Sequence, residues 1–463
     1  MKDDSVICAI ATTPGNGAIA LIRLSGKGSI AILDSLFRSP THQKRLTQQT
    51  SHTVHFGSIV YQDNVIDEVV VTLFKEPHSY TGEEVVEISC HGSTYIQQLI
   101  LQVLTKSGVR LAKPGEFTLR AFLNRKMDLS QAEAVADLIA SESEAAHNMA
   151  IHQLRGGFYK QIDTLRTELL NFSSMIELEL DFSEEDVEFA NREALQKLMI
   201  HIRETIDKLV KSFALGNVIK NGVPVAIVGS PNVGKSTLLN TLLQEDKAIV
   251  SEIAGTTRDA IEDVINIGGI NFRFIDTAGI RPTTDTIEAL GIERTFAKIS
   301  EARIILLLVE ATDTPEEIKK QITSLKPTPD QQVVIIVNKI DLSDGKKLEQ
   351  RLGKNAFGPF PTLYLSAKYH TNTGELTSLL LDIMKIKDIN KYDVVVSNVR
   401  HYEALTRALE AVVRVENDLA TEVTSDFIAQ DIREILHHFG EITGQITTDE
   451  ILGNIFSKFC IGK

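Results

Sequence analysis

The sequence has few cysteines, no long apolar run and no surplus of basic residues. Three cysteines lie far apart among 463 residues, which argues against a disulfide framework and for a reducing compartment. The longest apolar run is far too short to cross a membrane, and the first residues lack the apolar core of a signal peptide. We therefore expect a cytoplasmic protein that does not bind membranes.

The balance of charge is acidic. The chain has 62 Asp and Glu residues against 48 Lys and Arg residues, for a formal net charge of −14. General nucleic-acid binders carry clustered positive charge, so any RNA contact of this chain should be local or assisted by a partner. With 43% hydrophobic residues, the composition is otherwise that of a folded protein, and the length suggests roughly three domains.

Turn signals and hydrophobic periodicity divide the chain into four stretches. Residues 1–118 combine short apolar runs with a hairpin pattern, typical of an α/β domain. Residues 119–215 lack proline and have two glycines, and their apolar residues recur at helical spacing, as they do in residues 385–463. Residues 216–384 alternate strand and helix patterns. We predict a multidomain α/β and all-α protein in which the two helical stretches form one bundle, with residues 216–384 inserted as an α/β domain.

Two patterns in the first helical stretch give specific expectations. Ser130 and Glu133 are spaced for a capping box at the start of a helix whose apolar stripe reaches Ile139. A second stripe, which includes Met175, predicts another helix that faces the core.

The most informative stretch is a glycine-rich turn between an apolar strand pattern and a helical pattern. Gly229-Ser-Pro-Asn-Val-Gly-Lys-Ser236 matches G-x-x-x-x-G-K-[ST], the loop that binds nucleotide phosphates. Its glycines let backbone N–H groups face an anion at the positive end of the helix dipole. Lys235 can reach the β- and γ-phosphates, and the Ser236 hydroxyl can bind Mg²⁺. The residues expected to contact the nucleotide here are Asn232, Val233, Gly234, Lys235, Ser236 and Thr237.

Three further motifs follow at the ends of predicted strands, in the order that a Ras-like P-loop GTPase domain requires. In Asp276-Thr-Ala-Gly279, the Asp276 side chain should hold Mg²⁺ through a water molecule, and the Gly279 N–H should contact the γ-phosphate. In Asn338-Lys-Ile-Asp341, the final carboxylate suits two N–H donors of guanine that adenine does not present in that arrangement. Ser366-Ala-Lys368 fits the loop that closes over the base. The GTP-binding residues expected in these motifs are Asp276, Thr277, Ala278, Gly279, Asn338, Lys339, Asp341, Ser366, Ala367 and Lys368.

The stretch before residue 260 fits the first switch loop of such a domain. Thr257 can give its hydroxyl to Mg²⁺. Asn232, together with backbone carbonyls of this loop, could hold a monovalent cation that supplies positive charge at the transition state. The GTP-binding residues expected in the loop are Ser251, Glu252, Ile253, Ala254, Gly255, Thr256 and Thr257.

The chain departs from Ras-like GTPases at the position that orients the attacking water. Ile280 stands where those proteins carry a glutamine, and its side chain can neither donate nor accept a hydrogen bond. Another group must therefore position the water, or hydrolysis is very slow. Glu288 is a candidate for this catalytic role, with a solvated helix charge as the alternative.

Residues 1–118 carry no catalytic signature of their own. Cys90 and His91 lack partners at the spacing of metal ligands. Arg23 and Glu83 are either site residues or solvated charges, and the pattern alone favours solvation.

The GTPase motifs, the stretch of residues 114–134 and the terminal Phe459-Cys-Ile-Gly-Lys463 together resemble the MnmE (TrmE) family of tRNA-modification GTPases over the full length. The resemblance implies a folate-binding N-terminal domain that homodimerises, a helical bundle and an inserted K⁺-dependent GTPase domain. It also implies a heterotetramer with an FAD-dependent, MnmG-like flavoprotein. Together the two proteins would add an aminomethyl or carboxymethylaminomethyl group to C5 of the tRNA wobble uridine. The one-carbon unit would come from 5-formyltetrahydrofolate or a related tetrahydrofolate.

The resemblance further implies roles for single residues. Glu288 would act on the attacking water. Cys460 fits the terminal cysteine motif of the family, but the sequence shows no neighbour that would stabilise a thiolate, so we expect a packed or spare thiol without a catalytic role. The Mg²⁺ ligands would be Ser236 and Thr257, and the K⁺ ligands would be Asn232, Ser251, Ile253 and Thr256. The folate-binding residues would be Arg23, Glu83, Lys126 and Lys463, with Glu84 as an alternative to Glu83.

Two other functions fit part of the sequence. One is a GTP-regulated switch that binds ribosomal RNA during ribosome assembly, and the other is a folate-dependent methyltransferase with an incidental GTPase domain. The acidic charge and the helical flanks favour the tRNA-modifying GTPase over the first, and the missing base or nucleophile in residues 1–118 disfavours the second.

Overall fold

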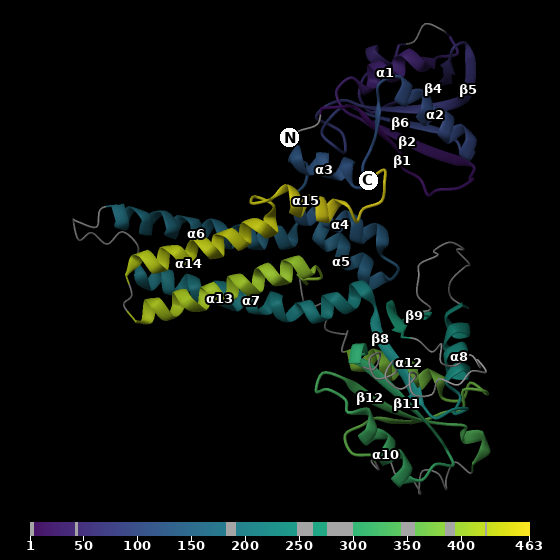
Figure 1. Ribbon diagram of the computed structural model, residues 1–463, viewed down its shortest axis with the longest axis vertical. Coiled ribbons are helices and arrows are strands. Elements are labelled where there is room, and N and C mark those ends of the chain that lie inside the picture. Colours follow the sequence, from purple (N-terminus) through teal and green to yellow (C-terminus); the bar gives the residue numbers. More distant parts are fainter. Residues whose placement is uncertain are drawn as a thin grey trace. The chain divides into compact units, whose positions relative to one another are not determined.

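The chain folds into two compact units, each with its own sheet (Figure 1). The computed structural model describes residues 4–41, 45–181, 191–247, 263–275, 300–343, 357–384, 394–421 and 424–463. The first unit contains Met1–Ile139, His152–Glu204 and Ala404–Lys463, and the second contains Ala140–Ile151 and Thr205–Glu403. Helices α5 (Glu144–Leu154), α7 (Arg192–Asn221) and α13 (Val399–Ala420) each continue from one unit into the other.

The first unit begins with a seven-stranded sheet in the spatial order β3-β4-β5-β6-β2-β1-β7. Neighbouring strands are antiparallel, except for the parallel pair of β1 and β7. Helices α1 (Ser29–Leu36) and α2 (Thr94–Lys106) pack on the sheet, and their apolar residues join those of the strands in one core. The strands are β1 (Ile7–Ile10), β2 (Ile19–Ser25), β3 (Phe37–Arg38), β4 (Thr53–Tyr61), β5 (Asn64–Phe74), β6 (Val85–His91) and β7 (Arg110–Leu111).

The predicted hairpin is confirmed. Strands β4 and β5 pair from Tyr61 and Asn64 at the turn to Thr53 and Leu73 at the open end. Gln62 and Asp63 form the turn with positive φ angles, the left-handed conformation that a tight two-residue hairpin loop requires.

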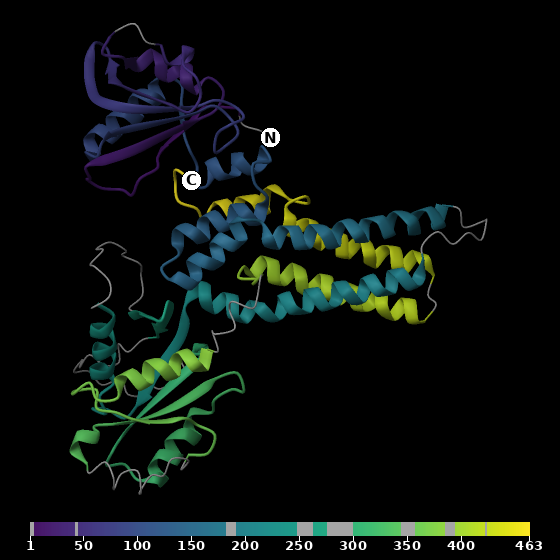
Figure 2. The ribbon, with the colours of Figure 1, turned by 180° about the vertical axis from the view of Figure 1, so that it is seen from behind.

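The rest of the first unit is helical. Figures 1 and 2 both show α14 lying along α6, and an ion pair between Arg433 and Glu177 links the two helices. Arg192 at the start of α7 pairs with Glu179 of α6 and donates to Ser425 of α14. The helices are α3 (Glu116–Leu123), α4 (Leu129–Ala140), α6 (Gly157–Asp181), α14 (Ser425–Thr443) and α15 (Asp449–Phe456), with the adjoining parts of α5, α7 and α13.

The predicted capping box of α4 is wrong by two residues. Asp128 accepts hydrogen bonds from the Gln131 backbone N–H and the Ser130 hydroxyl, and the Asp128 N–H donates to the Gln131 side chain. The box is therefore Asp128 with Gln131, and Ser130 lies inside the first turn.

Two members of the predicted apolar stripes are exposed. Met175 is 41% exposed and Ile139 is 48% exposed. In α6 the predicted Leu169 and Ile176 are buried, and Ser173 lies with them on the buried face, because burial follows the helix period closely and Met175 falls beside this face.

The second unit holds a six-stranded sheet in the order β13-β12-β11-β8-β10-β9. All neighbours are parallel except β9 and β10. Helices α8 (Lys235–Lys247) and α12 (Thr373–Met384) cover one face, and α10 (Pro315–Leu325) covers the other. The strands are β8 (Val223–Gly229), β9 (Asp263–Ile267), β10 (Ile270–Phe274), β11 (Ile304–Glu310), β12 (Gln332–Asn338) and β13 (Thr362–Tyr364). Strands β8, β11 and β12 are nearly continuous apolar runs because parallel strands are buried on both faces.

Within the described ranges, none of the helices combines the length and the apolar character that a membrane span needs.

Candidate functional site

The phosphate loop lies where β8 meets α8, and its backbone requires unusual angles. Gly229 has φ 155° and Gly234 has φ 104°, and a Cβ atom on Gly229 would lie 2.3 Å from the carbonyl oxygen of Leu308. Asn232, in the middle of the loop, has φ 62° and an exposed side chain. The loop thus curls back over the carboxyl end of the parallel strands, where ligands of open α/β sheets bind.

Lys235 is held at this loop. Its ammonium group donates to the carbonyl oxygens of Gly229 and Ser230 at 2.7 and 2.9 Å. Partial burial lowers the pKa of Lys235 from its ordinary value. A phosphate group that displaced these neutral carbonyls would give the ammonium an anionic partner, which is the stronger interaction.

The guanine motif is connected to the phosphate loop through Asn338. Its side-chain amide donates to the carbonyl of Val233 at 2.8 Å and accepts from the N–H of Ala367 at 3.1 Å. The Asn338 side chain is buried, so both hydrogen bonds are shielded from water. Three motifs that lie far apart in the sequence therefore meet at one buried amide.

Asp341 lies just beyond, in a single 3₁₀ turn formed by Ile340–Leu342. One oxygen of its carboxylate accepts from the Ser366 hydroxyl. This places the carboxylate beside the loop of residues 366–368, as the guanine assignment requires.

Two supporting residues escaped sequence analysis. Glu310, at the end of β11, forms an ion pair with Lys339, and the Thr241 hydroxyl of α8 donates to the carbonyl of Ala367 at 2.9 Å. Neither carries a motif signal, but Glu310 could have been suspected because it ends a buried strand next to β12.

Of the other predicted nucleotide residues, Ser236 and Thr237 lie in the first turn of α8 and Lys368 follows Ala367, and all three are exposed. The rest of the predicted nucleotide residues lie outside the described residues. These are Ser251, Glu252, Ile253, Ala254, Gly255, Thr256, Thr257, Asp276, Thr277, Ala278, Gly279 and the candidate catalytic Glu288.

In the first unit, Arg23 and Glu83 are not the solvated charges that the sequence pattern favoured. Their side chains are 14% and 17% exposed. Arg23 forms an ion pair with Glu87 at 2.8 Å and lies over the rings of Tyr80 and Phe117. Both charges are thus held by specific partners.

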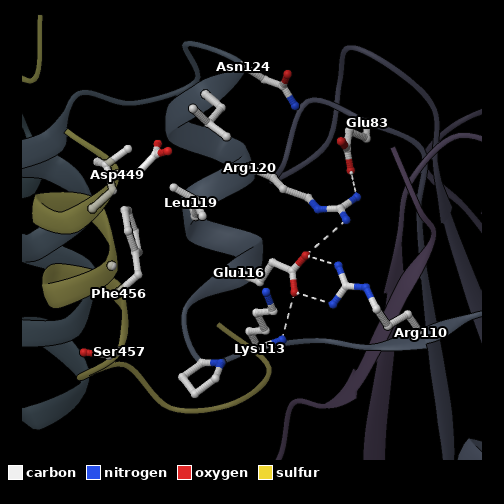
Figure 3. A pocket seen from close by; sticks show the side chains of 14 residues that line it. Glu83, Arg110, Lys113, Glu116, Leu119, Arg120, Asn124, Asp449, Phe456 and Ser457 are labelled. Carbon is white, nitrogen blue, oxygen red and sulfur yellow. Dashed lines mark hydrogen bonds and ion pairs between the residues drawn. The ribbon is translucent and has the colours of Figure 1, made fainter. Parts of the chain in front are cut away.

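Glu83 lines a cavity of about 620 Å³ between α3 and α15 (Figure 3). Leu119 and Leu123 of α3 and Leu452 and Phe456 of α15 form its apolar walls. Arg23, Lys126 and Lys463, the other predicted folate residues, are not among the residues that line it.

Those three residues nevertheless lie near the same region. The Lys126 ammonium donates to the carbonyl of Pro77. The methylene groups of Lys126 pack against Gly82, where a Cβ atom would lie 3.3 Å from them. The N–H of Phe117 in α3 donates to the carbonyl oxygen of Lys463 at 3.2 Å. One Arg23 nitrogen donates to the carbonyl of Gly462 at 3.4 Å. The C-terminal tail is thus fixed beside Arg23.

The neighbouring Glu84 has a different partner from Glu83. A carboxylate oxygen of Glu84 accepts from the N–H of Gly28, which precedes α1, and Glu84 does not line the cavity. Of these two neighbouring carboxylates, Glu83 lines the cavity and Glu84 does not. Cys460 is exposed, so its thiol is not packed in a core as the sequence analysis allowed.

The strand-to-helix phosphate loop and the guanine motif, joined through Asn338, define this protein as a P-loop GTP hydrolase. The family described as "GTP-binding protein TrmE N-terminus" matches residues 6–126, and that described as "MnmE helical domain" matches residues 129–460. The chain belongs to the MnmE (TrmE) family.

Relatives match the chain from end to end. Proteins named tRNA modification GTPase MnmE are 54% identical in Bacteroides thetaiotaomicron and 52% identical in Christiangramia forsetii, and both alignments cover 100% of this chain and of the relative. Among solved structures, an Aquifex aeolicus Era variant bound to GDP and AlF4⁻ is 28% identical over 41% of this chain and 66% of that chain, with TM-score 0.27. At so low a TM-score, the family assignment rests on the sequence matches.

Proposed function

We propose that this protein is a K⁺-dependent GTPase that takes part in tRNA modification in the cytoplasm. It works with an FAD-dependent, MnmG-like partner, and the reaction places an aminomethyl or carboxymethylaminomethyl group on C5 of the wobble uridine. The observation that carries the proposal is the presence of two sites in one chain of this family: a guanine-nucleotide site and a separate cavity that Glu83 lines.

At the nucleotide site, the residues of this chain bind and orient GTP. Lys235 neutralises the β- and γ-phosphates, Asp341 selects guanine, and Ser236 with Thr257 holds Mg²⁺. Asn232 is exposed in the loop and makes no hydrogen bond within the described residues, so its side-chain oxygen fits a role as a cation ligand. The remaining K⁺ ligands are Ser251, Ile253 and Thr256, and Glu288 positions the attacking water.

In the first unit, we propose that Arg23, Glu83, Lys126 and Lys463 bind a tetrahydrofolate such as 5-formyltetrahydrofolate. The fit is supported at Glu83, which lines a cavity with apolar walls and whose carboxylate can accept from N–H donors of a pterin ring. When bound, the folate supplies the one-carbon unit. The protein acts as a homodimer and forms a heterotetramer with the flavoprotein.

The full-length match to the family favours this function over the ribosome-assembly switch. The decisive test is the nucleoside composition of tRNA from cells with and without the gene. We expect the C5-modified wobble uridines to disappear in the deletion strain and to return with the wild-type gene. An unchanged profile would refute the proposed substrate.

Potassium dependence has a separate test. Replacing K⁺ by Na⁺ at equal ionic strength should lower GTP turnover by about tenfold or more, because a cation at Asn232 stabilises charge that develops only in the transition state. Glu288→Ala should lower turnover with little change in GTP affinity. Equal rates in the two salts would remove the cation from the mechanism.

A further inference from the structure

The cavity wall contains a chain of four alternating charges: Glu83, Arg120, Glu116 and Arg110 (Figure 3). One Arg120 nitrogen donates to Glu83 at 3.1 Å, and the other donates to Glu116 at 3.2 Å. Glu116 in turn accepts two hydrogen bonds from Arg110, at 2.6 and 3.0 Å. Two carboxylates and two guanidinium groups balance each other.

Arg120 is the central member of this chain. Its side chain is only 6% exposed, and the nitrogen that contacts Glu116 also donates to the carbonyl of Ser5 at 2.9 Å. A buried guanidinium with three fixed acceptors has little freedom to move, because each contact restrains its planar fork in a different direction. Arg120 is thus a rigid support for whatever it contacts.

Glu116 fixes Arg120 from the other side. It is the first residue of α3, so the positive end of the helix dipole favours its charge, and it lies one turn before Arg120. Burial alone raises the pKa of Glu116, but hydrogen bonds from Arg110, from the N–H of Lys113 and from Arg120 outweigh burial and lower it overall. The surroundings of Glu116 therefore favour its anionic form beside Arg120.

At Glu83, the support reaches one carboxylate oxygen only. Oε2 accepts from Arg120 and from the Ser25 hydroxyl, at 3.1 and 2.9 Å. Oε1 has no hydrogen-bond partner in the described part of the chain. Glu83 lines the cavity, so a carboxylate fixed at Oε2 leaves Oε1 available to a ligand.

We propose that Arg120 is a positioning residue: held by Glu116 and Arg110, it fixes Glu83 so that Oε1 accepts a hydrogen bond from the N–H edge of the one-carbon carrier. This deepens the proposed function and rests on folate binding at Glu83. Arg120 also lines the cavity, but its two terminal nitrogens already donate to Glu83, Glu116 and Ser5, so in this proposal it acts on the carrier through Glu83. Its contribution to affinity passes through Glu83, and this separates it from a residue that binds the ligand directly.

The test is a double-mutant cycle that measures binding of 5-formyltetrahydrofolate by calorimetry with the full-length protein. Arg120→Gln and Glu83→Gln should each weaken binding by about tenfold, since each loses the charge-assisted hydrogen bonds of one group. The double variant should bind no more weakly than Glu83→Gln alone, because Arg120 acts through Glu83. Arg38→Gln is the matched control: Arg38 pairs with Asp63 in the same domain, on the surface, and its loss should leave folate binding unchanged.

The outcomes separate the two proposals. If the wild-type protein does not bind the folate, the proposed folate site fails. If it binds and Arg120→Gln binds equally well, or if the two single effects add, the positioning role is wrong while the folate site stands. GTP turnover at the second unit and the circular dichroism spectrum report on folding of each variant. Should Arg120→Gln unfold, Glu116→Gln replaces it in the same cycle. We expect Glu116→Gln to weaken folate binding by about threefold, and to have no effect on binding when Glu83→Gln is already present.

Discussion

At the scale of single residues, the nucleotide site depends on the absence of a side chain at Gly234. Its φ of 104° lies in the region that L side chains rarely adopt, and a Cβ atom there would lie 2.3 Å from the side-chain nitrogen of Asn338. Asn338 cannot move aside without giving up its hydrogen bonds to Val233 and Ala367. One small residue thus permits both the turn of the phosphate loop and its connection to the guanine motif.

We therefore predict that Gly234→Ala weakens GTP binding by about thirtyfold or more, since backbone strain of this kind costs roughly 2 kcal/mol. Fluorescence titration with a labelled GTP analogue measures the change. Gly374→Ala is the control in the same domain, because Gly374 has no atom within 4 Å of its Cβ position and no positive φ. Equal affinities for the Gly234 variant and the wild type would show that the loop tolerates a Cβ atom.

At the scale of elements, the start of α4 shows where sequence analysis reached the right element but the wrong residue. Ser130 with Glu133 and Asp128 with Gln131 both satisfy the capping-box spacing, and the sequence offers no criterion to choose between them. The structure chooses Asp128, because Ser130 is fully buried and its carbonyl accepts from Gln153 of α5. Tertiary packing decided the boundary.

The two candidate caps differ in their predicted effect. Asp128→Ala removes the acceptor of the Gln131 N–H and should cost about 1 kcal/mol of local stability, whereas Ser130→Ala removes only a hydroxyl that donates to Asp128. Amide hydrogen exchange in the first turn of α4 should become about fivefold faster in the first variant and change less in the second. Faster exchange in Ser130→Ala than in Asp128→Ala would identify Ser130 as the N-cap residue.

At the scale of the whole molecule, the sequence predicted the nucleotide site far better than the cavity of the first unit. The phosphate loop and the guanine motif are short local patterns, each at the end of an apolar strand, so their chemistry can be recognised before folding is known. Glu83 and Arg120 are 37 positions apart, and Arg23 and Gly462 are 439 positions apart. No local pattern links such pairs, and Arg23 and Glu83 therefore looked like solvated charges.

The division into two units gives a final prediction about how the two sites cooperate. Asp341→Asn replaces an acceptor for guanine N–H donors by an amide that can donate to the extra carbonyl of xanthine. GTP turnover should fall by at least about a hundredfold, because the guanine donors then lack their acceptor. Binding of 5-formyltetrahydrofolate should stay unchanged, since Glu83 and its partners belong to the other unit.

In a reconstituted reaction of the Asp341→Asn variant with the flavoprotein and tRNA, XTP should restore the wobble-uridine modification that GTP no longer supports. Modification that continued with GTP alone, despite lost turnover, would show that hydrolysis does not drive the reaction.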